Sequence, residues 1–139
     1  MIRFARLFAC AAVANACLLL ACASKKEADA RQSAARVARA MEVLRGAPNP
    51  AKAAALSELA KVPCESPEAC SARDACVDAY KTHVEALELT QAAKLQASQG
   101  QAAAAAKVLG AAEQRLSEAS GKVLDCTDRE GALRHQYKL

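Results

Sequence analysis

The residues most able to take part in chemistry are the cysteines after residue 60. There are four of them: Cys64, Cys70, Cys76 and Cys126. Cysteine thiolates are zinc ligands, and His83 could complete such a site. However, five residues separate the first cysteine from the second and the second from the third, whereas paired ligands of structural zinc sites usually have roughly two to four residues between them. The Cys-x-x-Cys run of thioredoxin-like centres and the Cys-x-x-Cys-His run of haem attachment are also missing. We therefore expect no metal and no cofactor.

No catalytic motif stands out elsewhere in the chain. His83 and His135 are the only histidines, and the sequence has no glycine-rich phosphate loop, nucleophile elbow or two-histidine helix motif. We therefore predict that the chain is not an enzyme. One alternative is a carrier that holds a small ligand or a metal inside a helical bundle, and His83 is the only obvious polar group for such a core.

Composition argues against nucleic acid as a partner. The chain has 19 Lys and Arg against 15 Asp and Glu, and the two basic residues Arg3 and Arg6 lie in the first 21 residues. Beyond that segment the only aromatic residues are Tyr80 and Tyr137. The remaining part is therefore close to neutral and lacks the aromatic platforms on which single-stranded nucleic acid stacks.

Helical periodicity and helix-end signals place these residues on four helices. The first should run from about residue 28 to 45, because apolar residues recur at steps of four and three before Gly46 and Pro48. This stripe consists of Ala30, Ala34, Val37, Met41 and Leu44. The second should run from 50 to 62, with Asn49 as N-cap and Leu56, Leu59 and Val62 as buried residues. The third should run from Pro67 to about Ser98, with Ser66 as N-cap.

A tight reversal at residues 98–100 should join the third helix to a fourth, although one continuous helix through Gly100 is an alternative. On the third helix the expected seam is Val77, Tyr80, Val84 and Leu87, with Leu95 further along. On the fourth it is Ala105, Leu109, Ala112, Leu116, Ala119, Val123 and Cys126. Residues 128–131 resemble a helix end, followed by a short or frayed tail. The predicted fold is all-α, an up-down helical bundle dominated by a long antiparallel hairpin.

The hairpin geometry narrows the disulfide pairing. Residues whose numbers sum to about 200 should lie side by side, which puts Cys126 level with a point between Cys70 and Cys76. Cys70 and Cys76 are about 9 Å apart along one helix, too far for a disulfide. Cys64 lies in the turn before Pro67, within reach of Cys70. We therefore prefer Cys64–Cys70 with Cys76–Cys126, and Cys64–Cys76 with Cys70–Cys126 is the alternative.

The N-terminal stretch determines where the protein is expected to reside. Arg3 and Arg6 precede an uncharged apolar run from Leu7 to Ala21, which is typical of a signal peptide and short for a spanning helix. The run ends in Leu19-Leu20-Ala21-Cys22, which resembles the lipobox of bacterial lipoproteins. The resemblance implies cleavage before Cys22 and acylation of that cysteine, with palmitate as an expected chain. The domains would then be a signal peptide at 1–21, the acylated cysteine and a polar tether at 22–27, and a helical domain at 28–139.

Other interpretations of this stretch remain open. Cleavage after Ala23 would release a soluble secreted protein, an uncleaved run would be an apolar anchor, and cleavage before Cys17 is also conceivable. If the cell is Gram-negative, the lipoprotein resemblance implies the outer membrane facing the periplasm, because Ala23 rather than Asp follows Cys22. The chain is also similar in kind to the murein lipoprotein. In that family the wall-linking lysine is the last residue, whereas here Lys138 is followed by Leu139.

The leading functional hypothesis is a lipid-anchored envelope protein that acts as a structural or interaction module. The third helix should be about 48 Å long, whereas the first two are too short to cover it, so the hairpin should be partly uncovered around residues 92–108. The expected contact residues are Ala92, Ala93, Ala97 and the alanines from Ala102 to Ala106. Apart from the membrane, the expected partner is another envelope protein or a second copy of the chain.

Overall fold

The structure, a computed structural model, describes the backbone of residues 5–139 and the side chains of residues 25–139. Four α-helices and one short 3₁₀ turn make up this part of the chain, which contains no β-strand. They are α1 (Ala5–Gly46), η1 (Asn49–Ala51), α2 (Lys52–Lys61), α3 (Pro67–Ser98) and α4 (Ala102–Tyr137). The all-α fold with a long antiparallel hairpin is therefore confirmed.

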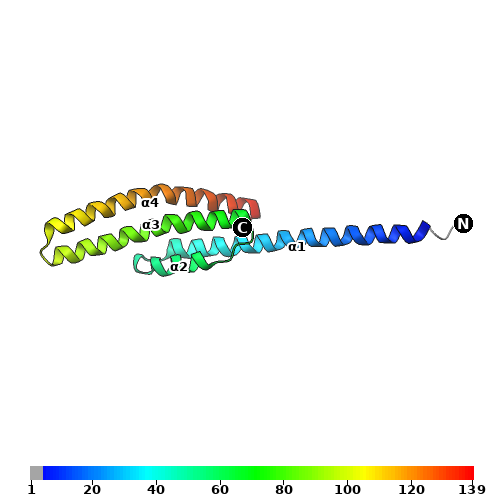
Figure 1. Ribbon diagram of the computed structural model, residues 1–139, viewed down its shortest axis with the longest axis horizontal. Helices are drawn as coiled ribbons and strands as arrows, with labels where there is room; N and C mark the ends of the chain where they lie inside the picture. Colours follow the sequence, from blue (N-terminus) through cyan, green and yellow to red (C-terminus); the bar gives the residue numbers. More distant parts are fainter. Residues whose placement is uncertain (1–4) are drawn as a thin grey trace.

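The helices form two layers (Figure 1). One layer is the α3–α4 hairpin, and the other consists of the C-terminal half of α1 together with α2, which lie along the base of the hairpin. The tip of the hairpin extends beyond the end of the α1–α2 layer, whereas α1 continues past the base in the opposite direction. The hairpin tip and the N-terminal part of α1 therefore point away from each other.

Helix α1 starts earlier than its sequence predicts. The expected boundary was residue 28, after a polar tether at 22–27, but the backbone of these residues belongs to α1. The segment 23–29 contains no glycine or proline and consists mostly of good helix formers, which explains why the helix continues through it. The predicted start of the helix is therefore wrong, whereas the tether role of residues 22–27 stays a prediction.

The core of the base lies where the predicted stripe of α1 meets the other helices. Val37, Met41 and Leu44 are almost completely buried, as is Leu59 of α2. The first two helices therefore turn toward the core the faces that their periodicity indicates, although Ala30, Leu56 and Val62 are only partly buried.

Alanine, not leucine, fills the seam between α3 and α4. The buried residues along it recur every seven positions: Ala72, Ala79, Ala86 and Ala93 on α3, and Ala105, Ala112, Ala119 and Cys126 on α4. Small side chains let the two backbones approach closely, and the Cα atoms of Cys76 and Cys126 are 4.6 Å apart.

The expected seam was therefore partly wrong. Leu109 and Leu116 are 45% and 38% exposed, and Leu95 is 60% exposed. Two helices that touch through alanine leave no space between them for a leucine, so the leucines at the alternate heptad positions lie beside the seam. Tyr80 is buried, as expected, but it packs under the α1–α2 layer.

Two predicted helix ends are confirmed, namely the cap of the third helix and the reversal after it. The predicted N-cap of the second helix and the predicted end of the fourth helix are wrong. The Ser66 hydroxyl accepts a hydrogen bond from the Ala69 amide at 3.2 Å and caps α3 as predicted. The reversal is also confirmed, because Gly100 has a φ of +75°, a conformation that glycine adopts without strain. Asn49 was wrongly predicted as an N-cap, since it lies inside η1, where no side chain caps the first turn.

Helix α4 also runs through its predicted end at 128–131. Its last turns are held by tertiary contacts that the local sequence does not reveal. Leu133 is almost completely buried, and the Arg45 guanidinium of α1 donates to the Glu130 carboxylate. Burial and ion pairing therefore outweigh the weak helix propensity of Gly131.

Candidate functional site

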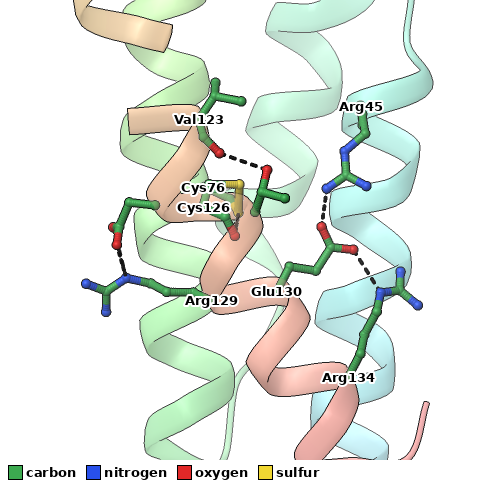
Figure 2. The surroundings of a disulfide bond; sticks show 9 residues. Arg45, Cys76, Val123, Cys126, Arg129, Glu130 and Arg134 are labelled. Atoms are coloured by element: carbon green, nitrogen blue, oxygen red, sulfur yellow. Dashed lines mark hydrogen bonds and ion pairs between the residues drawn. A yellow bond between two sulfur atoms is a disulfide. The ribbon is translucent and has the colours of Figure 1, made fainter. Parts of the chain in front are cut away.

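The four downstream cysteines form the two disulfides preferred from the sequence. Cys64–Cys70 joins the turn before α3 to its first turn, with Cα atoms 5.2 Å apart. Cys76–Cys126 crosslinks α3 to α4 inside the seam (Figure 2). In this state the sulfur atoms are not available as zinc-binding thiolates. Among residues 25–139, no group of three or more His, Cys, Asp and Glu side chains is arranged to hold a metal ion.

A buried lysine caps the C-terminus of α1. Lys52, which is only 7% exposed, donates from Nζ to the carbonyl oxygens of Leu44 at 2.9 Å and Arg45 at 2.8 Å. Its ammonium also lies 5.5 Å from the centre of the Tyr80 ring, within the range of a cation–π contact. Burial lowers the pKa of Lys52. The two carbonyl groups and the ring thus surround the ammonium, so Lys52 is a structural cap.

His83, the candidate core ligand, lies beside this cap. Its ring makes an edge-on contact with Tyr80, with the ring centres 6.2 Å apart. Burial and the positive charge of Lys52 lower the pKa of His83 from its ordinary value, which favours the neutral imidazole. His135 is exposed in the last turn of α4, and the fold does not bring the two histidines together.

The hollow around His83 is an open surface feature of about 430 Å³. It is lined by Asn49, Lys52, Tyr80, His83, Leu116, Ala119, Ser120 and Val123. The only charged group in this lining is already engaged with the end of α1, and the neutral form of the imidazole is favoured. The hollow therefore offers a ligand no available charge.

A buried carboxylate connects α1 to α4 near the Cys76–Cys126 disulfide (Figure 2). Glu130 is 3% exposed and forms ion pairs with Arg45 of α1 and with Arg134, one turn further along α4. Arg134 also lies 3.7 Å from Glu42. A charge buried this deeply needs such partners, so the network holds the two layers in register. Sequence reasoning missed it, although Glu130 follows Leu116 and Val123 in the same heptad series.

The most distinctive surface begins where the α1–α2 layer ends. Beyond this end, one face of the hairpin continues uncovered, and we call it the distal face. It consists of Val84, Leu87 and Gln91 on α3 and of Leu109 and Leu116 on α4. The first three line a hollow of about 430 Å³ beside Asn49, Pro50 and Ala53, and Leu116 lines the hollow near His83. Leu109 is one heptad from Leu116 and therefore lies on the same side of α4.

The predicted contact alanines are only in part accessible. Ala93 and Ala105 are buried in the seam and unavailable to a partner. The other alanines predicted for contact are exposed: Ala92, Ala97, Ala102, Ala103, Ala104 and Ala106. Leu109 and Leu116 of the distal face are exposed as well, so this part of the hairpin offers both small and large apolar side chains.

The opposite end of the molecule brings α1 close to the end of α4. The Arg31 guanidinium lies 3.4 Å from the Lys138 carbonyl oxygen, and the Tyr137 hydroxyl donates to Glu68 at 3.2 Å. The chain therefore leads toward its N-terminus from the base of the hairpin, away from Gly100. Cys22 and the predicted signal peptide at 1–21 lie outside the residues whose side chains are described, so cleavage and acylation stay predictions.

Within the part searched, residues 25–139, no helix is long and apolar enough to cross a membrane. Comparisons of the chain with protein-family models, with curated proteins and with solved structures found no match.

Proposed function

We propose that this chain is a lipid-anchored protein of the bacterial cell envelope and that its helical hairpin makes contact with another protein. The observation that carries the proposal is the distal face, where Leu109 and Leu116 are exposed and Val84 and Leu87 are half-buried, on the part of the hairpin away from the lipobox. Monomeric soluble proteins rarely expose large contiguous apolar surfaces without a binding role. In a Gram-negative cell the proposed location is the outer membrane, on its periplasmic side.

The arrangement of the two ends supports this role. Acylation at Cys22 would hold the base of the hairpin near the membrane, because residues 26–31 lie beside residues 136–138 there. The hairpin is about 48 Å long at ~1.5 Å per residue, so its tip would extend well beyond the lipid headgroups. The two disulfides suit an exported protein, since such bonds persist in oxidising compartments.

The anchor is tested by Cys22→Ala, with Cys17→Ala as the matched control. Each buried CH₂ of an acyl chain contributes about 0.8 kcal/mol, and two or more chains give stable anchoring. We expect Cys22→Ala to leave the membrane fraction or to remain unprocessed, whereas Cys17→Ala is processed and membrane-bound. If Cys22→Ala stays in the membrane at its mature size, the lipid anchor is wrong.

A further inference from the structure

The distal face continues a surface that the chain itself covers near the base. On α4, Val123 packs against the core beneath the α1–α2 layer, and Leu116 and Leu109 follow at intervals of seven residues. On α3, Tyr80 is buried beneath the same layer, and Leu87 follows seven residues later. The heptad stripes are thus continuous, but the second layer ends at η1, whose Asn49 and Pro50 border the hollow that Val84, Leu87 and Gln91 line. The distal face therefore has the pattern of a helical packing surface that lacks its second layer.

We propose that the distal face of a second copy of this chain supplies the missing layer, in an antiparallel two-fold dimer. The direction follows from the shape of the molecule in Figure 1. A second hairpin that pointed the same way would run into α1 and α2 at the base. A hairpin that points the opposite way overlaps only the uncovered part, and its own base then lies beyond Gly100.

Two charged residues on α3 indicate where the two-fold axis passes. Glu88 and Lys94 lie three residues before and after Gln91, and all three line the same hollow on α3. Within residues 25–139, neither charged side chain has an ion-pair partner. An axis that passes Gln91 pairs Glu88 of each copy with Lys94 of the other. Such reciprocal pairing is the signature of an isologous interface.

The interface is small. From Val84 to Ser98, the overlap is about 22 Å long, and two adjacent helices are about 20 Å wide, so each copy buries about 450 Å². The total of about 900 Å² is below the ~1,200–2,000 Å² of stable interfaces, which indicates a weak dimer that depends on local concentration. This inference deepens the proposed contact function by naming the partner, and it does not depend on acylation of Cys22.

The test is photo-crosslinking of the full chain in cells that export it. A photoreactive amino acid replaces Gln91, near the two-fold axis, or Ala92, an exposed neighbour that points away from the distal face. Two epitope tags on separately expressed copies identify a dimer. We expect position 91 to give an adduct of twice the monomer mass that carries both tags, with a yield at least about tenfold above position 92.

Substitutions on the distal face provide a second test of the dimer. Leu109→Glu with Leu116→Glu should lower the yield at position 91 by at least about tenfold, because four carboxylates would enter an apolar interface. Leu124→Glu is the matched control, since Leu124 is exposed outside the distal face. Helix content by circular dichroism should stay unchanged in every variant, because all three leucines are exposed.

Three results would overturn the dimer: equal yields at positions 91 and 92, a yield that the double Glu substitution does not change, or an adduct with a different protein. The last of these would still support a contact function, with another partner. Membrane fractionation of the same cells tests the lipid anchor separately. Failure of the anchor and failure of the dimer are therefore distinguishable.

Discussion

The two disulfides should differ strongly in their contribution to stability. Chain-entropy reasoning relates the effect of a disulfide to the length of the loop that it closes. Cys76–Cys126 closes a loop with a sequence separation of 50, which corresponds to about 4 kcal/mol. Cys64–Cys70 has a separation of only 6, which corresponds to about 2 kcal/mol. The difference of about 2 kcal/mol is large for a domain whose core is mostly alanine.

Alanine is the suitable replacement for both pairs. Cys126 occupies the heptad position that Ala105, Ala112 and Ala119 occupy elsewhere on α4, so alanine fits the seam and leaves little cavity. Urea unfolding followed by circular dichroism would measure the free energy of unfolding of the two double variants against the oxidised wild type. We expect a loss of about 4 kcal/mol for Cys76→Ala with Cys126→Ala, and about 2 kcal/mol for the other pair.

Reduced wild-type protein should be less stable than either variant, because it loses both crosslinks. The reasoning would be refuted if removal of the long-loop disulfide cost no more than removal of the short one. That result would mean that the unfolded chain keeps enough structure around the hairpin to make the crosslink unimportant.

Three further predictions concern single side chains, with urea unfolding as the measurement. Lys52→Met should cost about 2 kcal/mol because it removes the hydrogen bonds donated to the carbonyl groups of Leu44 and Arg45 at the end of α1. The exposed control Lys61→Met should change stability by less than about 0.5 kcal/mol, and equal effects would contradict the capping role. Ala112→Leu should cost about 1–3 kcal/mol or more by forcing α3 and α4 apart, whereas Ala111→Leu, on the exposed side of α4, should be nearly neutral. Because the pKa of His83 is lowered in the folded state, the unfolded chain binds a proton more readily, and stability should fall as the pH drops through about 6.5, the ordinary histidine value. His83→Gln should remove this part of the fall, and an unchanged slope would contradict the prediction.

Features that depend on local signals were predictable from the sequence. Ser66-Pro67 and Gly100 define the start of α3 and its reversal, and these two points fix which residues of α3 and α4 lie level. That register puts Cys126 level with a point between Cys70 and Cys76, and the short distance along the chain from Cys64 to Cys70 leaves Cys76 as the partner of Cys126. The pairing preferred on these grounds is the one in the structure.

The sequence does not show which neighbouring helix each helix face packs against, so features that depend on this packing were not predictable. A heptad pattern identifies two inward positions per repeat, but it does not say which one faces the adjacent helix and which one faces the next layer. Leu109 and Leu116 were therefore placed in the seam, although they border it. Lys52 donates to the end of α1, and Glu130 pairs with Arg45 of α1, so a single sequence gives no direct signal for either contact. Only the pair of Glu130 with Arg134, four residues apart on α4, has a local signal.

The same property of the sequence explains both the close hairpin and its exposed leucines. Alanine at every seventh position allows α3 and α4 to touch along their whole length, and this contact displaces the leucines at the alternate positions to one face. Near the base, α1 and α2 cover that face, so the displaced side chains there become part of a core. Beyond η1, whose Asn49 and Pro50 border Val84 and Leu87, nothing in the described chain covers it, and the displaced leucines there form a surface. Because alanine buries little apolar area, the tip gains less stability from its own seam than the base gains from two layers. A partner that covers the distal face would therefore stabilise the part of the hairpin that is least supported by its own chain.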